Sequence, residues 1–275
     1  MMKLSSKPSA SGKYPIQALQ RGMHVLDTLL DARTPLKLED ICALTGLPKS
    51  TAFRIIVNLL QGQYLVETDE GYWLGLKLLR LGALVEEKLD LKQQARPFLT
   101  ELRDRVNETV HMAVLDRELR VVYVEKLATQ HAVGLMASRI GITAPMHCTA
   151  LGRAMAAFQP EAEILRWIQT HGLEAYTDAT ITDEAAFLQE LHEIRSRDYA
   201  VDKGEYEASV RCVAAPIRDR TGMVIAAVSI SAPDTRMPLR RLDNPMATEV
   251  VETAFRISQA LGYSEQRVES SWADH

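Results

Sequence analysis

Residues 38–60 constrain the fold most, because they predict two helices joined by a short turn. In the second helix, over 49–60, apolar residues recur with the period of an α-helix and form one stripe: Ala52, Ile55, Ile56 and Leu59. The first helix, over 38–44, is expected to bury Leu38, Ile41 and Leu44. The turn contains Gly46, as is usual in a helix-turn-helix unit, and Pro48 suits the start of the second helix.

Polar side chains occupy the opposite face of the second helix. The residues that we assign to DNA contact are Lys49, Ser50, Thr51, Arg54 and Asn58, together with Arg21 from the preceding helix. Hydroxyl, guanidinium and amide groups suit both phosphates and base edges in a major groove. A surface helix with an ordinary polar face is the alternative that the pattern of this helix alone leaves open.

A hairpin predicted directly after the second helix makes the motif a winged helix-turn-helix. Residues 64–68 and 72–74 are predicted as strands joined by a turn at 69–71, and Gly62 is expected to end the helix before them. A helix starting at Ile16 precedes the motif, and its apolar stripe is expected to comprise Leu19, Met23, Leu26 and Leu30. This order of elements favours DNA binding.

The charge distribution agrees with an N-terminal part that faces phosphate. The whole chain has a formal net charge of −4, which argues against nonspecific nucleic-acid binding by its entire surface. Residues 1–65 carry eight basic and four acidic residues, a net charge of +4, so the remainder carries −8. A chance imbalance of this size is the alternative.

Composition and targeting signals indicate a cytoplasmic protein without membrane association. The chain is 47% hydrophobic and 25% charged, as is normal for a globular protein. It has no apolar run of the roughly 20 residues that a membrane-spanning helix needs, and its polar first residues lack the features of a signal peptide. Three widely spaced cysteines, Cys42, Cys148 and Cys212, favour a reduced compartment.

A helix predicted over 75–89 carries two apolar strips on nearly opposite faces. One strip comprises Leu78, Leu81, Val85 and Leu89, and the other comprises Leu76, Leu79 and Ala83. Two strips suggest that one packs on its own chain and the other on a second copy. A symmetric dimer is the common way in which a winged motif binds a two-part DNA site.

The remaining residues predict a mixed α+β body with an antiparallel sheet. Its helices are expected near residues 91–105, 148–158, 160–171, 184–197 and 245–262. Its strands are expected at residues 109–115, 120–124, 132–138, 212–217 and 223–231.

With these elements in place, the chain resembles the IclR family of bacterial transcriptional regulators from about residue 16 to 262. The runs that carry the resemblance are 18–22, 45–51 with Arg54, 72–75, 108–111, 145–154 and 211–217. The resemblance implies a GAF-like domain that binds a small effector, often a carboxylate, and needs no cofactor. It also implies a homodimer or homotetramer on double-stranded operator DNA.

By position, the resemblance assigns effector contacts to Met136, Ala150, Leu151, Asp202, Val210, Cys212, Ser229 and Ser231. Two patterns in the residues agree with this assignment. A helix that starts near Cys148 would offer free amide groups to an anion, and the two serines share one side of a strand. The chain departs from the family pattern at Arg153, Ser209 and Gly204-Glu205, which flank these positions.

Two rival readings concern the same part of the chain. A zinc site could use Cys148, Cys212, His111 and His147, but closely spaced ligand pairs are lacking and we expect no metal. A small-molecule enzyme could use Cys212 as nucleophile with Asp202 and His147. Because Cys212 begins an apolar strand, we expect an inert thiol. An enzyme would consume its ligand, whereas a sensor would return it unchanged.

We therefore predict an α+β chain with a flexible arm at 1–15, a winged helix-turn-helix domain at 16–75, a linker helix at 76–90, an effector-binding domain at 91–264 and a tail at 265–275. The predicted function is a ligand-responsive regulator, most simply a repressor, of a catabolic operon. The predicted ligand is a small organic acid or a related metabolite.

Overall fold

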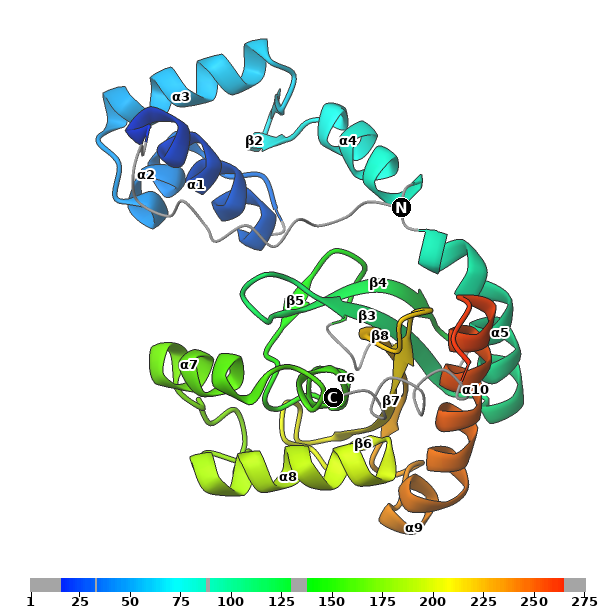
Figure 1. Cartoon of the computed structure of the whole chain (residues 1–275). Helices are drawn as coiled ribbons and strands as arrows, with labels where there is room; N and C mark the ends of the chain where they lie inside the picture. Colours follow the sequence, from blue (N-terminus) through cyan, green and yellow to red (C-terminus); the bar gives the residue numbers. More distant parts are fainter. Residues whose placement is uncertain (1–15, 33, 88–89, 130–137, 265–275) are drawn as a thin grey trace. The chain divides into compact units, whose positions relative to one another are not determined.

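The chain divides into two units, which we call the head (Met1–Leu89) and the body (Asp90–His275) (Figure 1). The structure is a computed structural model that describes residues 16–32, 34–87, 90–129 and 138–264. The predicted arm, the predicted tail and nearly all of the predicted strand at 132–138 lie outside these ranges. Within them, no helix is both long and apolar enough to cross a membrane.

The head has the predicted order of elements, so the winged helix-turn-helix is confirmed. It comprises α1 (Gln17–Ala32), α2 (Leu38–Thr45), α3 (Lys49–Gln61), β1 (Leu65–Thr68), β2 (Gly71–Leu74) and α4 (Leu76–Glu87). The two strands are antiparallel, and Thr68 pairs with Gly71. The turn is therefore one residue shorter than predicted. An isolated bridge between Leu36 and Tyr72 ties the segment before α2 to the wing.

The core of the head corrects the apolar stripes that we predicted for its first two helices. α1 buries Val25 and Leu29, whereas the predicted Leu19, Met23 and Leu30 are exposed. α2 buries Ile41 but leaves Leu44 exposed, while α3 buries Ala52 and Ile56 as predicted. Apolar residues lie on more than one side of α1, so periodicity could not decide which side packs against the other helices.

Two glycines of the head are required by its backbone. Gly46 ends α2 in the left-handed conformation, with φ 68°. Gly71 has φ 138°, and a Cβ there would lie 2.5 Å from the Leu36 carbonyl oxygen. α3 ends at Gln61 with Gly62 as its C-cap, as predicted, but Gly62 is right-handed and Gln63 takes the positive φ of 61°. Gly62 instead allows the Tyr64 ring to approach, since a Cβ would lie 2.8 Å from it.

The body is built on a six-stranded sheet in the order β5-β4-β3-β8-β7-β6, and every neighbouring pair is antiparallel. The strands are β3 (Thr109–Leu115), β4 (Val121–Leu127), β5 (Thr143–Ala144), β6 (Ala200–Asp202), β7 (Val210–Arg218) and β8 (Val224–Pro233). The predicted antiparallel sheet is confirmed. The two- and three-residue strands β5 and β6 were not predicted, because they are too short to show alternation.

Helices cover both faces of this sheet (Figure 1). On one face, α5 (Asp90–Val106) and α10 (Ala247–Ala260) share a core with strand residues that include Met112, Val228 and Ile230. On the other face, α6 (Ala150–Ala156) and α8 (Glu184–Arg197) pack around Ala214 and Ala227. The remaining helical segments are α7 (Glu161–His171), α9 (Leu239–Arg241) and a π-helical turn η1 (Leu242–Met246).

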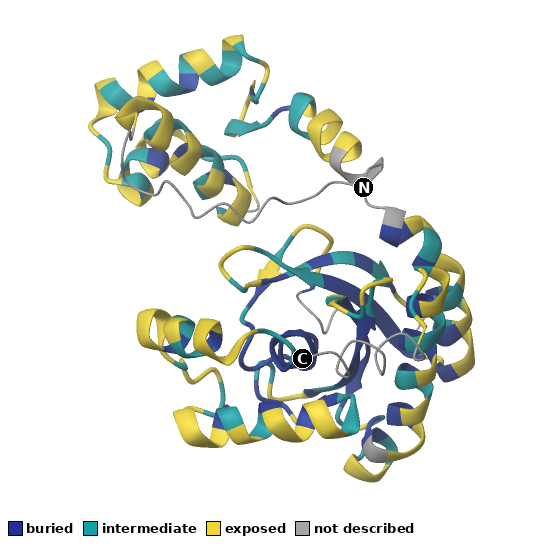
Figure 2. Ribbon diagram, viewed as in Figure 1, coloured by how far each residue is buried: buried dark blue, intermediate teal, exposed yellow. Residues whose placement is uncertain are grey.

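The short helix α6 is buried along its whole length (Figure 2). Its small residues, Ala150, Gly152, Ala154 and Ala156, permit this close packing. A Cβ added at Gly152 would lie only 2.2 Å from the Met146 carbonyl oxygen, so the backbone before the helix packs directly on it. The helix starts two residues later than predicted, with Thr149 as its N-cap. This packing brings the start of α6 against the sheet.

Candidate functional sites

The outer face of α3 carries the polar groups that the sequence assigned to DNA contact. Ser50, Arg54 and Asn58 are exposed, and Thr51 is half-buried. The apolar residues Ala52 and Ile56 hold the opposite face in the core. The guanidinium and hydroxyl groups of this face are therefore presented to solvent.

Two of the assigned residues already have partners inside the head. Lys49 Nζ lies 3.2 Å from Glu39 Oε1, and both side chains are exposed. The Asn58 side-chain amide donates to the Arg54 carbonyl oxygen over 2.7 Å. Exposed pairs of this kind are worth at most about 1 kcal/mol, so an approaching phosphate or base could displace them.

A groove of about 710 Å³ between α1 and α3 brings four of the six assigned residues together. Arg21, Thr51, Arg54 and Asn58 line it, whereas Lys49 and Ser50 are not among its lining residues. Apolar side chains line the same groove, including the exposed Leu19 and Met23. The groove therefore combines two guanidinium groups with an uncovered apolar surface.

Phe53 is a candidate contact that sequence reasoning missed. Its aromatic side chain is 49% exposed on α3, next to Arg54 and one turn from Ser50. Phenylalanine can make apolar contact with the methyl group of thymine. The helical repeat could have identified Phe53 as exposed, because this residue falls outside the apolar stripe that packs into the core.

The wing presents acidic rather than basic groups. Glu67, Asp69 and Glu70 are exposed at its tip, and residues 65–75 contain no lysine or arginine. Carboxylates repel phosphate, so this hairpin adds no positive charge to the polar face of α3.

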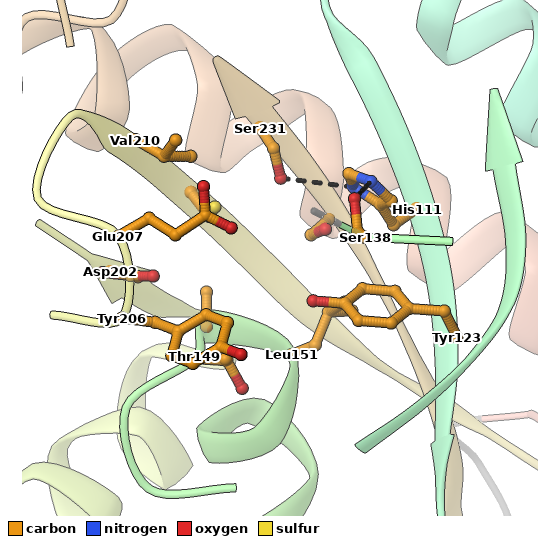
Figure 3. Close-up of a pocket in the computed structure, with 13 residues that line it drawn as sticks. His111, Tyr123, Ser138, Thr149, Leu151, Asp202, Tyr206, Glu207, Val210 and Ser231 are labelled. Carbon is orange, nitrogen blue, oxygen red and sulfur yellow. Dashed lines mark hydrogen bonds between the residues drawn. The ribbon is translucent and has the colours of Figure 1, made fainter. Parts of the chain in front are cut away.

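A second candidate site is a pocket between the start of α6 and the sheet of the body (Figure 3). The space open to the centres of water-sized molecules is about 30 Å³. Its lining comprises His111, Tyr123, Ser138, Thr149, Ala150, Leu151, Asp202, Tyr206, Glu207, Val210, Cys212, Ser229 and Ser231. Seven of the eight residues assigned to effector contact are in this set. The eighth, Met136, lies outside the described residues.

Strand register explains why distant residues meet in this pocket. Cys212 on β7 pairs with Asp202 on β6 and with Ser231 on β8. Ser229, two residues along β8, pairs with His111 on β3. Residues two apart on a strand share a face, so these side chains lie in two neighbouring rows on the α6 side of the sheet.

His111 lies at the centre of a hydrogen-bonded chain. Its Nε2 lies 2.8 Å from Ser138 Oγ, and its Nδ1 lies 3.3 Å from Ser231 Oγ (Figure 3). Lys126 Nζ donates to the Ser138 carbonyl oxygen over 2.6 Å. Burial, with a smaller effect from Lys126, lowers the pKa of His111 to about 3. The imidazole is therefore neutral at physiological pH and links two hydroxyl groups of the lining.

Asp202 anchors the loop that follows β6. Its Oδ1 accepts the backbone N–H groups of Gly204 and Glu205 at 2.9 and 2.7 Å. Burial raises the pKa of this carboxyl group, and Arg153 and the two backbone donors oppose that rise. Asp202 thus combines a structural role with a place in the pocket lining.

A buried ion pair supports the pocket from behind. Arg153 on α6 is 1% exposed, pairs with Glu205 and donates from Nη2 to the Val201 carbonyl oxygen over 2.6 Å. Burial raises the pKa of Glu205 to about 7, more than the Arg153 charge lowers it. The sequence analysis placed Arg153 and Glu205 beside the expected effector contacts, and the structure pairs them with each other.

The expected anion site at the start of α6 has fewer free donors than predicted. Thr149 Oγ1 accepts the Gly152 N–H over 3.1 Å and donates to the Pro145 carbonyl oxygen. One of the first-turn amide groups is therefore already capped. Ala150 and Leu151 remain part of the lining.

The structure gives no support to a zinc site or a nucleophilic thiol at the cysteine and histidine residues considered for those roles. His147 Nε2 lies 2.9 Å from the Glu174 carbonyl oxygen, so this ring is held by backbone. Burial raises the pKa of Cys148 to about 12 and raises that of Cys212 well above its ordinary value. Both thiols are protonated at neutral pH and are poor nucleophiles and ligands.

Comparison with known proteins finds relatives along most of the chain. The family model described as "Bacterial transcriptional regulator IclR C-terminal" matches residues 83–259, and the one described as "IclR helix-turn-helix domain" matches residues 18–69. The HTH-type transcriptional regulator XynR of Escherichia coli K12 is 35% identical over 250 residues, which cover 90% of this chain and 98% of that protein. The transcriptional repressor AllR of the same strain is 32% identical over 248 residues, which cover 90% of each.

A solved structure supports the same relationship. The IclR homologue of Microbacterium hydrocarbonoxydans, in complex with 4-hydroxybenzoate, matches with a TM-score of 0.75 and 29% identity. The match covers 89% of this chain and 98% of that one.

Proposed function

Because this chain belongs to the IclR family of bacterial transcriptional regulators, we propose that it is a repressor that a small metabolite releases from operator DNA. It has the DNA-binding and effector-binding domains of that family. Its relatives are regulators of transcription, so the alternative of an enzyme at Cys212 is wrong. The repressor assignment is supported by AllR, which is named as a repressor.

The exposed face of α3 is the observation that carries the proposed DNA contact. Arg54 and Ser50 are free to face a major groove, and Arg21 and Thr51 extend the surface across the groove towards α1. Lys49 and Asn58 join the surface if DNA displaces their present partners. Phe53 adds an apolar group next to Arg54. Operator binding would take place in the cytoplasm, where bacterial DNA lies.

The α6 pocket is the proposed effector site, and Ala150, Leu151, Asp202, Val210, Cys212, Ser229 and Ser231 are its proposed contacts together with Met136. The expected ligand is a small organic acid or a related metabolite of a catabolic pathway. The bound 4-hydroxybenzoate in the Microbacterium hydrocarbonoxydans homologue supports a small-molecule site. Only about 30 Å³ is open between the described lining residues, so a metabolite would have to widen the pocket. A ligand that selects a wider conformation can shift a two-state equilibrium.

A homodimer, or a homotetramer built from it, would cover the apolar surface of the head. Leu76, Leu79 and Leu84 on α4 are all more than half exposed, and Leu76 is 78% exposed. Exposed leucines along a helix favour burial against a second copy. We propose that residues 76–90 link the DNA-binding residues 16–75 to the effector-binding residues 91–264. Through this linker, the ligand would change the spacing or assembly of the two heads.

Binding to a selected duplex tests the DNA half of this proposal. A duplex is selected from a random library by the full chain, and its affinity is then measured across salt concentrations. Arg54→Ala should weaken binding by about 1–3 kcal/mol if Arg54 contacts a base edge. Arg166→Ala, which removes an exposed arginine from the body, is the matched control and should change little. Failure to select any duplex would contradict the proposed function.

A further inference from the structure

The walls of the α6 pocket are fixed to different degrees. Three of its lining strands, β3, β7 and β8, are interior strands of the sheet, and the start of α6 is buried with Gly152 packed closely on Met146. Residues 203–209, between β6 and β7, join neither a strand nor a helix, and Ala208 and Ser209 are exposed. Because only about 30 Å³ is open between the described lining residues, entry of a metabolite requires one wall to move. This loop can move at the least cost.

The first half of the loop is anchored to the rest of the body. The Thr177 and Thr180 hydroxyl groups donate to the carbonyl oxygens of Gly204 and Glu205 over 2.7 and 2.6 Å. Asp202 Oδ1 accepts the N–H groups of the same two residues. Movement of this half would break several hydrogen bonds at once, so it stays in place when the pocket widens.

A second anchor lies at the end of the loop, where the Ser209 carbonyl oxygen accepts the Asp234 N–H over 2.9 Å. Residues 206–208 span the stretch between the two anchors. Two of them, Tyr206 and Glu207, line the pocket (Figure 3). A movement of this stretch would therefore open the pocket while both anchors and the sheet keep their positions.

An aromatic contact holds Tyr206 in its position at the pocket. Its ring meets the ring of Tyr176 edge to face, with the two centroids 5.2 Å apart. Tyr176 is 43% exposed and is not among the described residues that line the pocket, so the pair joins the pocket wall to the molecular surface. Aromatic pairs of this geometry stabilise a structure by more than their buried area alone. Tyr176 directly precedes Thr177, so one segment both anchors the loop and holds the Tyr206 ring.

From these observations we infer that residues 206–208 form a gate over the α6 pocket, and that the contact between Tyr206 and Tyr176 holds this gate shut. The inference rests on the proposed effector site and adds a control of access to it. In the open state, the Tyr206 ring leaves Tyr176 and the pocket widens at this wall. A molecule larger than water then reaches the side chains of the sheet, including Cys212.

The rate at which Cys212 is alkylated tests the gate without any ligand. This thiol lines the pocket and is half-buried, whereas Cys148 is buried and is not among the described lining residues. The full chain is treated with iodoacetamide, and alkylation of each cysteine is followed by peptide mass spectrometry. Cys148 is the internal reference, because unfolding of the body exposes both thiols and gate opening exposes Cys212 alone.

Removal of the Tyr176 ring is the most informative change, because this ring can affect the pocket only through Tyr206. Tyr176→Ala should raise the rate at Cys212 relative to the reference by about three- to tenfold, as expected for loss of an aromatic pair. Tyr206→Ala should raise it at least as much. Tyr176→Phe keeps the ring, and Tyr263→Ala removes a different aromatic pair of the body, so both controls should stay within about twofold of the wild type.

Three results would overturn the inference. The first is an unchanged ratio of the two alkylation rates in Tyr176→Ala. The second is a rise at Cys148 that matches the rise at Cys212, which would show that the ring stabilises the whole body. The third is alkylation of wild-type Cys212 as fast as in the unfolded chain, which would show a pocket already open to the reagent. Intact binding of the wild type to the selected duplex with any of these results rejects the gate alone, whereas absent duplex binding rejects the proposed function.

Discussion

The head and the body present their polar side chains in opposite ways. On α3 of the head, Ser50 and Arg54 face solvent. In the body, Arg153 and Glu205 are buried and paired with each other, and the buried His111 is hydrogen-bonded to two serines. Exposed polar groups are hydrated and can exchange water for phosphate at little cost. Buried ones depend on partners inside the protein or on a bound molecule, and the Ser229 hydroxyl group has no partner among the described residues.

Breaking the buried ion pair should have the largest effect on stability. Arg153→Ala leaves Glu205 buried without its cation, and we expect it to lower the free energy of unfolding by about 3–5 kcal/mol. Urea unfolding of the full chain, followed by circular dichroism, measures this change. The double variant Arg153→Met/Glu205→Leu should recover much of the loss, because no charge is left unpaired. A loss of less than about 1 kcal/mol in the single variant would contradict this expectation, because the buried pair would then contribute no more to stability than an exposed ion pair does.

His111 should make the stability of the body depend on pH. Burial holds its folded-state pKa near 3, below the ordinary 6.5, so the folded state binds fewer protons than the unfolded state between these values. The stabilisation is present above pH 6.5 and is lost as pH falls towards 3. Between pH 7 and 5 we expect a loss of about 2 kcal/mol from this group.

The control for this pH effect is a difference between variants. Glu205 acts in the opposite direction, because its pKa is raised to about 7 and its contribution is lost as pH rises through that value. His111→Gln removes only the first effect, so its unfolding free energy should fall less steeply on acidification than that of the wild type. His24→Gln, on the exposed surface of α1, should follow the wild type. Parallel curves for all three proteins would contradict a buried neutral His111.

On the head, Phe53 offers a smaller test of what an exposed residue does. If Phe53 contacts a thymine methyl group, Phe53→Ala should weaken binding to the selected duplex by about 1 kcal/mol. Replacing the contacted thymine by deoxyuridine should weaken the wild type by a similar amount and should not weaken the variant further. Fluorescence anisotropy measures all four combinations. Additive losses would show that Phe53 and the methyl group act separately.

The surface pair of Lys49 and Glu39 should contribute least. Both side chains are exposed, so Glu39→Ala should change the free energy of unfolding by less than about 1 kcal/mol. The same variant frees Lys49 for phosphate, so duplex affinity should rise slightly and depend more steeply on salt. Thermal unfolding and a salt titration of duplex binding measure the two effects. A stability loss near that of Arg153→Ala would erase the contrast between head and body.

Much of this architecture follows from sequence patterns with a clear period. The apolar stripe of α3, the neighbouring strands β7 and β8 and the shared face of Ser229 and Ser231 each follow from a repeat of 3.6 or 2 residues. The side of α1 that packs against the other helices could not be predicted, because α1 carries apolar residues on more than one side. Its exposed Leu19 and Met23 line the groove instead.

The pocket was predictable only in part, for a related reason. Seven lining residues were assigned through the family resemblance, but Tyr206 and Glu207 come from a loop without any period. His111 lies in an apolar strand. It pairs with Ser229 there, so it lies on the α6 side of the sheet, and this position could have identified it as a lining residue. The pairing of Arg153 with Glu205 joins residues far apart in the chain and required the folded structure.

Operator affinity of the Ser229→Ala variant, measured with and without a small organic acid that raises the thermal midpoint of the wild type, tests most directly whether exposed groups bind DNA while buried groups bind the ligand. We predict that the variant binds the selected duplex as tightly as the wild type when no ligand is present. Ligand should weaken the wild type by about 5- to 150-fold and leave the variant nearly unchanged. Loss of duplex affinity by the variant without ligand would contradict the separation of the two roles.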